Sequence, residues 1–215
     1  MPGHRGGQRS SVGDEVADER VRGLDPRTGS LLWTEPFEVT NGTAVATPIF
    51  QEGLVVVSSY YDGTKAIRLG EQPNEVQVPW HDRRNLRALM SQPLYRSGYV
   101  YLLDKRHGLT CFELASGEKL WDDDNRMTPK GRNPQATMVW LDEEDKVLAL
   151  NSDGDLILIR LNPEGYVELA RSNIIGGTWA HPGYAGNCIY ARSDEEIADA
   201  SEIMMQHNAS KVERV

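Results

Sequence analysis

Few residues of this chain have the types and spacing that catalysis or metal binding requires. The two cysteines, Cys111 and Cys188, are too few and too far apart for a disulfide framework or a zinc site. We expect both to be buried free thiols, because cysteine is among the most buried residue types. His181 precedes Pro182, which favours an extended backbone and a hydrogen-bonded structural histidine. No serine or cysteine has the partner spacing of a nucleophilic triad, so no catalytic residue is predicted.

Two short polar stretches also contain the residue types of a metal site. Asn151 to Asp155 resembles a calcium-binding loop, but Arg160 stands where a closing glutamate is needed. This stretch is therefore interpreted as a hairpin turn. Asp122 to Asp124 follows a predicted strand and is interpreted as a solvated loop. Neither stretch predicts a bound metal ion.

These residues are carried by a repeated pattern of predicted strands. Four segments line up, and their third positions are residues 48, 93, 138 and 182, which are 45, 45 and 44 residues apart. Each segment is followed by a β-rich run, and three of these runs lead into a tight turn that contains glycine. A period near 45 residues with four strands per unit predicts a β-propeller built from four-stranded antiparallel blades.

The series of repeats is incomplete at both ends. Residues 21–38 supply the second half of a unit. Three nearly complete units follow, and then the first half of another, at about 44–82, 89–124, 134–171 and 178–191. After Ile197 no third strand is expected, and the sequence has mild helical character. Half-units that pair would close a four-bladed ring, whereas unpaired half-units predict an arc of a larger propeller. We favour the arc, an all-β incomplete propeller of about three full blades with a half-blade at each end.

Composition and charge bound the domain organisation and the classes of partner. Residues 1–20 are expected to be disordered, residues 21–200 to form the propeller repeats, and residues 201–215 to form an irregular or helical tail. The net charge of −9 argues against a nucleic-acid-binding surface. No apolar run approaches the ~18 residues of a membrane-spanning helix, and the first residues lack the apolar stretch of a secretory signal.

In a propeller the first strand of each blade lines the central channel, and the loops that lead into these strands form one rim. The predicted rim residues precede those strands or lie in those loops, and they are Arg87, Gln92, Arg132, Asn133, Gln135, Thr137, Trp179 and His181. Basic and amide side chains on one rim of an acidic protein would suit an anionic ligand or an acidic partner surface. The alternative interpretation is that these loop residues are polar only because they are solvated.

Residues 23–33 and 111–121 share a motif in which tryptophan follows glycine by four positions and closes the unit. This motif resembles that of the quinoprotein-type β-propeller family, and the resemblance covers roughly residues 20–200. It implies that the motif tryptophans pack between neighbouring blades, where an indole buries a large flat area and its N–H can reach a carbonyl. Structural docking roles are therefore expected for Gly29, Trp33, Trp80, Gly117 and Trp121.

The resemblance implies either an enzyme or a binding platform. Enzymatic members bind pyrroloquinoline quinone and calcium at a site with two adjacent cysteines, and this chain has no adjacent cysteine pair. Other members, including an outer-membrane protein assembly lipoprotein, use the same blades for binding. We therefore expect a non-catalytic scaffold without a cofactor, which binds a protein or an extended or anionic ligand. The alternative is a fragment of a quinone-dependent dehydrogenase whose cofactor-binding blades are missing.

Compartment and assembly are less constrained by the sequence. The resemblance implies a periplasmic or other extracytoplasmic location, but no export signal is recognised, so the compartment stays open. Open blade edges would favour self-association. A third possibility is a gene fragment without a folded function of its own.

Overall fold

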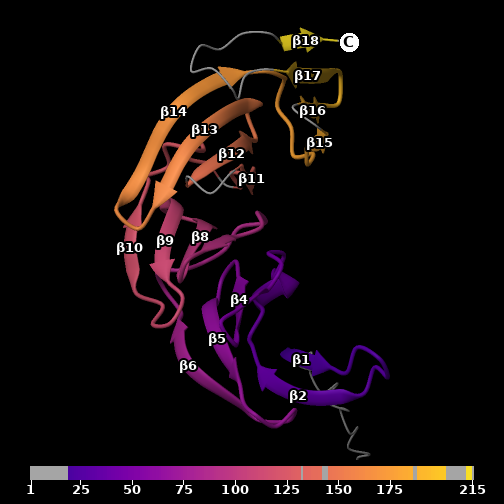
Figure 1. Cartoon of the computed structure of the whole chain (residues 1–215), viewed down its shortest axis with the longest axis vertical. Helices are drawn as coiled ribbons and strands as arrows, with labels where there is room; N and C mark the ends of the chain where they lie inside the picture. The colour runs from indigo at the N-terminus through magenta and orange to yellow at the C-terminus, as the bar shows by residue number, and fades with distance from the viewer. Residues whose placement is uncertain (1–18, 132, 142–144, 186–187, 202–211, 215) are drawn as a thin grey trace, which may run out of the picture.

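The computed structural model describes residues 19–131, 133–141, 145–185, 188–201 and 212–214. In this part of the chain the strands form five antiparallel sheets, one of two strands and four of four strands. Within each sheet the strands follow one another in sequence order, as in a meander. The sheets stand one after another in an open arc (Figure 1).

We name the sheets by their order along the chain. The half-blade contains β1 (Arg20–Leu24) and β2 (Leu31–Pro36), and the short 3-10 helix η1 (Thr40–Gly42) follows it. Blade 1 contains β3 (Ile49–Gln51), β4 (Leu54–Ser59), β5 (Gly63–Leu69) and β6 (Val76–Asp82). Blade 2 contains β7 (Leu94–Arg96), β8 (Tyr99–Asp104), β9 (Gly108–Glu113) and β10 (Lys119–Asp122). Blade 3 contains β11 (Ala136–Trp140), β12 (Lys146–Asn151), β13 (Asp155–Asn162) and β14 (Gly165–Asn173). Blade 4 contains β15 (Gly183–Ala185), β16 (Cys188–Arg192), β17 (Ile197–Ser201) and β18 (Val212–Arg214).

The described residues include no helix long and apolar enough to cross a membrane. The prediction of an incomplete all-β propeller is confirmed, because the half-blade and blade 4 lie at opposite ends of the arc and their described strands do not pair with each other (Figure 1). The predicted half-unit at the beginning and the three full units after it also correspond to the half-blade and blades 1 to 3.

The end of the chain differs from the sequence-based prediction. The third strand expected to be missing is β17, which pairs with β16 from Arg192↔Ile197 to Cys188↔Ser201. In the described part of the predicted tail, β18 pairs with β17 and completes a fourth blade. Ala198 of β17 is fully buried against blade 3 residues. Packing on a neighbouring sheet therefore overrides the helical preference of this alanine-containing segment.

Alternation along each strand builds the core between neighbouring blades. In β8, Val100 and Leu102 pack with residues of blade 1, whereas Tyr101 and Leu103 pack with residues of blade 3. This follows from the period of two along a strand, which sends successive side chains to opposite faces of the sheet. A third cluster joins Leu148 and other blade 3 residues to blade 4. The core is therefore a row of layers, each shared by two blades.

Tryptophan side chains of β6 and β10, the strands at the outer edge of the arc, bridge neighbouring blades (Figure 1). The indole N–H of Trp80 donates to the carbonyl oxygen of Leu114 at 3.0 Å. The indole N–H of Trp121 donates to the carbonyl oxygen of Asn162 at 3.1 Å. The Trp80 ring packs against Gly117, where a larger residue would not fit, because a Cβ at Gly117 would lie 2.7 Å from that ring. These contacts tie blade 1 to blade 2 and blade 2 to blade 3.

The corresponding residues of the half-blade have a different environment. Trp33 lies against Gly23 of its own sheet, where an added Cβ would come 2.0 Å from the indole nitrogen. Gly29 has a φ of +73° in the β1–β2 turn and open space around it. The half-blade is joined to blade 1 by Lys65, whose ammonium donates to Glu35 at 2.9 Å. Trp140 also bridges two blades, because its indole N–H donates to the carbonyl oxygen of Tyr95 at 3.1 Å. The repeat motif did not predict this role.

Candidate functional site

Loops from successive blades meet on one rim of the arc. The turn between β12 and β13 lies against the loops on either side of it, because the N–H of Ser152 donates to the carbonyl oxygen of Gln135 at 2.8 Å. The carbonyl oxygen of Ser152 accepts in turn from the N–H of Thr178 at 3.0 Å. Loops that precede β11 and β15 are thereby brought to the same edge of the molecule. This edge is the rim predicted from the sequence.

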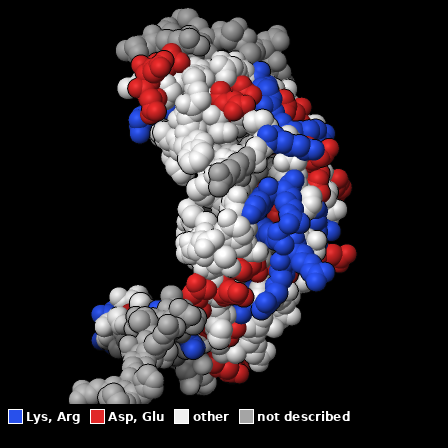
Figure 2. All heavy atoms as spheres, turned by 180° about the vertical axis from the view of Figure 1, so that it is seen from behind, with Lys and Arg blue, Asp and Glu red and all other residues white. Residues whose placement is uncertain are grey.

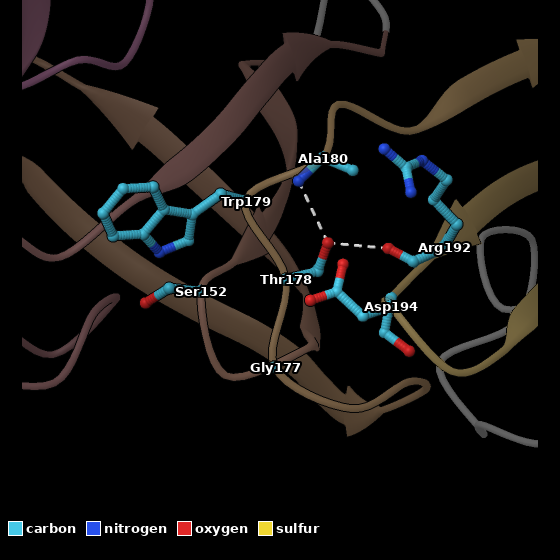
Figure 3. A pocket seen from close by; sticks show the side chains of 8 residues that line it. Ser152, Gly177, Thr178, Trp179, Ala180, Arg192 and Asp194 are labelled. Carbon is cyan, nitrogen blue, oxygen red and sulfur yellow. Dashed lines mark hydrogen bonds between the residues drawn. The ribbon is translucent and has the colours of Figure 1, made fainter.

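A cavity of about 590 Å³ lies in this rim between blade 3 and blade 4. It is lined by Ser152, Gly177, Thr178, Trp179, Ala180, Arg192, Ser193 and Asp194 (Figure 3). Thr178 orders the loop, because its hydroxyl donates to the carbonyl oxygen of Arg192 at 2.6 Å and accepts from the N–H of Ala180 at 3.0 Å. The Trp179 side chain is 60% exposed. The lining is therefore mainly polar, with one exposed aromatic ring at its edge.

A second, smaller hollow shares Thr178, Trp179 and Ala180 with the cavity. It is lined by Met90, Ser91, Gln135, Ala136, Thr137, Leu150, Thr178, Trp179, Ala180 and His181. The Ser91 hydroxyl links its walls, because it accepts from the N–H of Ala136 at 3.2 Å and lies 3.4 Å from the side-chain oxygen of Gln135. We call the cavity and this hollow together the rim site. Four of the predicted rim residues, Gln135, Thr137, Trp179 and His181, come together in it.

The other predicted rim residues are not part of the rim site. Asn133 accepts a hydrogen bond from the hydroxyl of Tyr60 at 3.1 Å, on the turn between β4 and β5. The N–H of Arg87 donates to the carboxylate of Asp104 at 2.8 Å. Gln92 is exposed just before β7 and lines neither hollow. Arg132 lies outside the described residues.

Sequence reasoning missed two features of this rim. Arg192, Ser193 and Asp194 line the cavity from the turn after β16, which lacks the glycine of the corresponding turns in the three preceding units. The ammonium of Lys105 lies 3.7 Å from the ring centre of Tyr60 and 4.2 Å from that of Tyr61. The adjacent tyrosines just before the Asp62-Gly63 turn were the available signal for this contact.

Comparison with known proteins identifies the family. A family model described as outer membrane protein assembly factor BamB matches residues 5–123, which is more than half of the chain. The chain belongs to this family. The resemblance to quinoprotein-type β-propellers is thereby confirmed.

Solved structures show the fold of this BamB-family chain. BamB from Moraxella catarrhalis is 19% identical with a TM-score of 0.61, over 89% of this chain and 54% of that chain. The computationally designed Ika8 protein is 15% identical with a TM-score of 0.57, over 88% and 55%. A europium-containing methanol dehydrogenase is 13% identical with a TM-score of 0.46, over 65% and 26%. The chain thus spans about half the length of the first two. No curated protein matches the sequence.

The two acidic or amide-rich stretches of this family member have structural roles. The side-chain oxygen of Asn151 accepts from the N–H groups of Asp153 and Asp155 at 3.0 and 2.9 Å, which confirms the predicted hairpin turn. The prediction of a solvated loop is wrong for Asp123, which is 0% exposed. Its carboxylate accepts backbone N–H groups of three residues, Leu109, Asn125 and Met127. The buried Asp123 carboxylate therefore fixes the backbone of the loop through these hydrogen bonds.

The prediction of two buried thiols holds for Cys111 and is wrong for Cys188, which is half-buried. Burial raises the pKa of Cys111 to about 12, and the thiolate is the reactive form of cysteine.

We expect Cys188 to react with a thiol reagent in the native protein and Cys111 only after unfolding. Absorbance titration with Ellman's reagent, with and without guanidinium, measures this. Cys188→Ser should abolish the native signal, and rapid native reaction of that variant would contradict the expectation.

Proposed function

We propose that this chain is a non-catalytic propeller scaffold that binds a segment of a protein partner at the rim site. The observation that carries the proposal is that Trp179 is 60% exposed and lines two hollows, whose walls come from blades 2, 3 and 4. Tryptophan is enriched among the residues that dominate protein–protein binding energy. A large aromatic ring left exposed beside a cavity is therefore suited to anchoring a partner.

The chemistry of the lining supports a peptide-like ligand. Hydroxyl groups of Ser152 and Ser193, with the charged Arg192 and Asp194, surround the cavity. Such side chains can exchange hydrogen bonds with the amides and carbonyls of an extended segment. The family description, an assembly factor for outer membrane proteins, also fits a role in which the ligand is another protein. The capture experiment below identifies the bound protein.

Replacing Trp179 with alanine should abolish most of the capture of a partner. The tagged chain and its Trp179→Ala and His181→Ala variants would be used to isolate crosslinked proteins from an extract of the source organism. Phe50→Ala is the matched control, because Phe50 is also 60% exposed but lies in β3, away from the rim site. Capture of the same proteins in equal yield by the wild-type chain and both rim variants would place the binding site elsewhere.

The alternative function, a fragment of a quinone-dependent dehydrogenase, is tested separately. The residues present do not fit the cofactor site that the resemblance implies, since Cys111 in β9 and Cys188 in β16 belong to different blades. Within the described residues, no three His, Cys, Asp or Glu side chains are grouped as a metal site requires. Reconstitution with the quinone and calcium should give no quinone absorbance and no dye-linked alcohol oxidation. Either signal would favour the enzyme.

A further inference from the structure

Basic side chains are concentrated on one face of this acidic protein. Figure 2 shows Lys and Arg gathered over the middle of the convex half of that face, with Asp and Glu at both ends and scattered along the convex edge. Three loops that lie side by side are rich in cations, and we call this set the basic ridge: Arg83, Arg84, Arg87, Lys105, Arg106, Arg126 and Lys130. Because the net charge of the chain is −9, the ridge does not simply reflect a basic composition.

Hydrogen bonds to backbone carbonyl oxygens hold these loops together. The N–H of Lys105 donates to the carbonyl oxygen of Arg87 at 2.9 Å, which joins the loop after β6 to the turn after β8. The side-chain amide of Asn125 donates to the carbonyl oxygen of Arg106 at 3.3 Å, which joins that turn to the loop after β10. The cations of three loops from blades 1 and 2 are therefore displayed on one fixed surface.

Three carboxylates of the same loops are directed at the backbone. Asp82 accepts from the N–H groups of Arg84, Asn85 and Leu86, and Asp104 accepts from those of Arg87, Arg106 and His107. Burial alone would raise the pKa of Asp82, but these hydrogen bonds hold it below its ordinary value. Asp104 and Asp123 are 1% and 0% exposed. Asp104 and Asp123 therefore lie beneath the ridge, where an approaching ligand does not meet them, whereas Asp82 is half-buried.

Five of the seven ridge cations are exposed to solvent, namely Arg83, Arg84, Arg106, Arg126 and Lys130. Among the described residues, the guanidinium groups of Arg84 and Arg106 form no ion pair. Arg83 and Lys130 have only exposed partners, Glu38 at 3.9 Å and Asp124 at 3.2 Å. Such solvated pairs contribute little and are easily exchanged. Partial burial, with the nearby charges of Arg87 and Arg106, holds the pKa of Lys105 below its ordinary value. An anion placed on the ridge would relieve this repulsion.

We propose that the basic ridge binds an acidic, extended segment of the protein partner. This inference rests on the proposed scaffold function and adds the chemistry of the segment. Arginine side chains bind carboxylates through paired N–H donors, and three consecutive loops offer them in a row. A nucleic acid or an anionic membrane would extend over the acidic residues at both ends of the ridge and be repelled (Figure 2). A short acidic segment avoids that repulsion.

The test uses a fluorescein-labelled peptide of alternating glutamate and serine, with glutamine in place of glutamate as the neutral control. Fluorescence anisotropy should show salt-sensitive binding of the glutamate peptide only. The double variant Arg84→Glu/Arg106→Glu should weaken it by about tenfold or more. Arg27→Glu/Arg160→Glu is the matched control, because it changes the net charge equally but at exposed positions outside the ridge. The affinity of this control variant for the glutamate peptide should stay within about twofold of that of the wild type. Circular dichroism verifies that both variants are folded.

Several results would overturn the ridge proposal. The first is that the wild-type chain does not bind the glutamate peptide. The second is that both double variants weaken this binding equally. The third is that the chain binds a DNA duplex or phosphatidylserine vesicles more tightly than it binds the glutamate peptide. The capture experiment separates this failure from that of the scaffold function. If Trp179→Ala loses the partner while Arg84→Glu/Arg106→Glu keeps it, the scaffold function stands and the acidic segment is rejected.

Discussion

Replacing Asp123 with alanine should lower the free energy of unfolding by about 3 kcal/mol or more, a loss measurable by urea denaturation. The side chain is 0% exposed, and its carboxylate accepts from Leu109, Asn125 and Met127 at 2.9, 2.9 and 2.8 Å. Alanine would leave these backbone donors without an acceptor in a dry environment, at roughly 1–3 kcal/mol each. Gly108 is part of the same arrangement, because a Cβ there would lie 2.1 Å from the carboxylate.

The neighbouring Asp124 provides a matched control for this prediction. Its side chain is 83% exposed, and within the described part of the chain its one ion pair is with Lys130, which is 71% exposed. Asp124→Asn should therefore change the unfolding free energy by no more than about 0.5 kcal/mol, because asparagine also tolerates the left-handed backbone of this position, which has a φ of +47°. A stability loss of similar size in the two variants would show that Asp123 does not have the proposed role under the loop.

Trp121→Ala is expected to lower the unfolding free energy by about 3 kcal/mol, and to loosen blade 2 from blade 3. The Trp121 ring packs against the core cluster these blades share, with its centroid 6.0 Å from that of Tyr101. The indole N–H also donates to the carbonyl oxygen of Asn162, across the blade boundary. Because repeat proteins are stabilised through neighbouring interfaces, loss of this contact should broaden the denaturation curve as well as shift it.

Trp179 is the natural comparison for Trp121. It is the same residue type but 60% exposed, so Trp179→Ala should leave the denaturation curve nearly unchanged while it reduces partner capture. Trp121→Ala should change stability first. If Trp179→Ala destabilised the protein as much as Trp121→Ala, the ring at the rim would have a structural role and the proposed function would lose its main support.

Residue patterns alone predicted much of the fold because propeller blades are local. Each strand of a meander pairs with its sequence neighbours, so turns such as His107-Gly108 and the runs beside them fix a blade without distant information. Blade 4 was the exception. Its last two strands are separated by a long intervening stretch, and β17 owes its strand conformation to pairing and to packing on blade 3. This pairing and packing cannot be predicted from the residues of β17 alone.

The rim shows the same division. The sequence by itself determined the repeat, the blade order and the edge of the arc on which Gln135, Thr137, Trp179 and His181 lie, because the 45-residue period places equivalent loops at equivalent positions. Only the tertiary structure decided which of these loops share a hollow, that Asp123 is buried, and that Arg84 and Arg106 face solvent over inward-turned carboxylates. The physical reason is that such groupings depend on loop conformation and on contacts between blades, which no local pattern encodes.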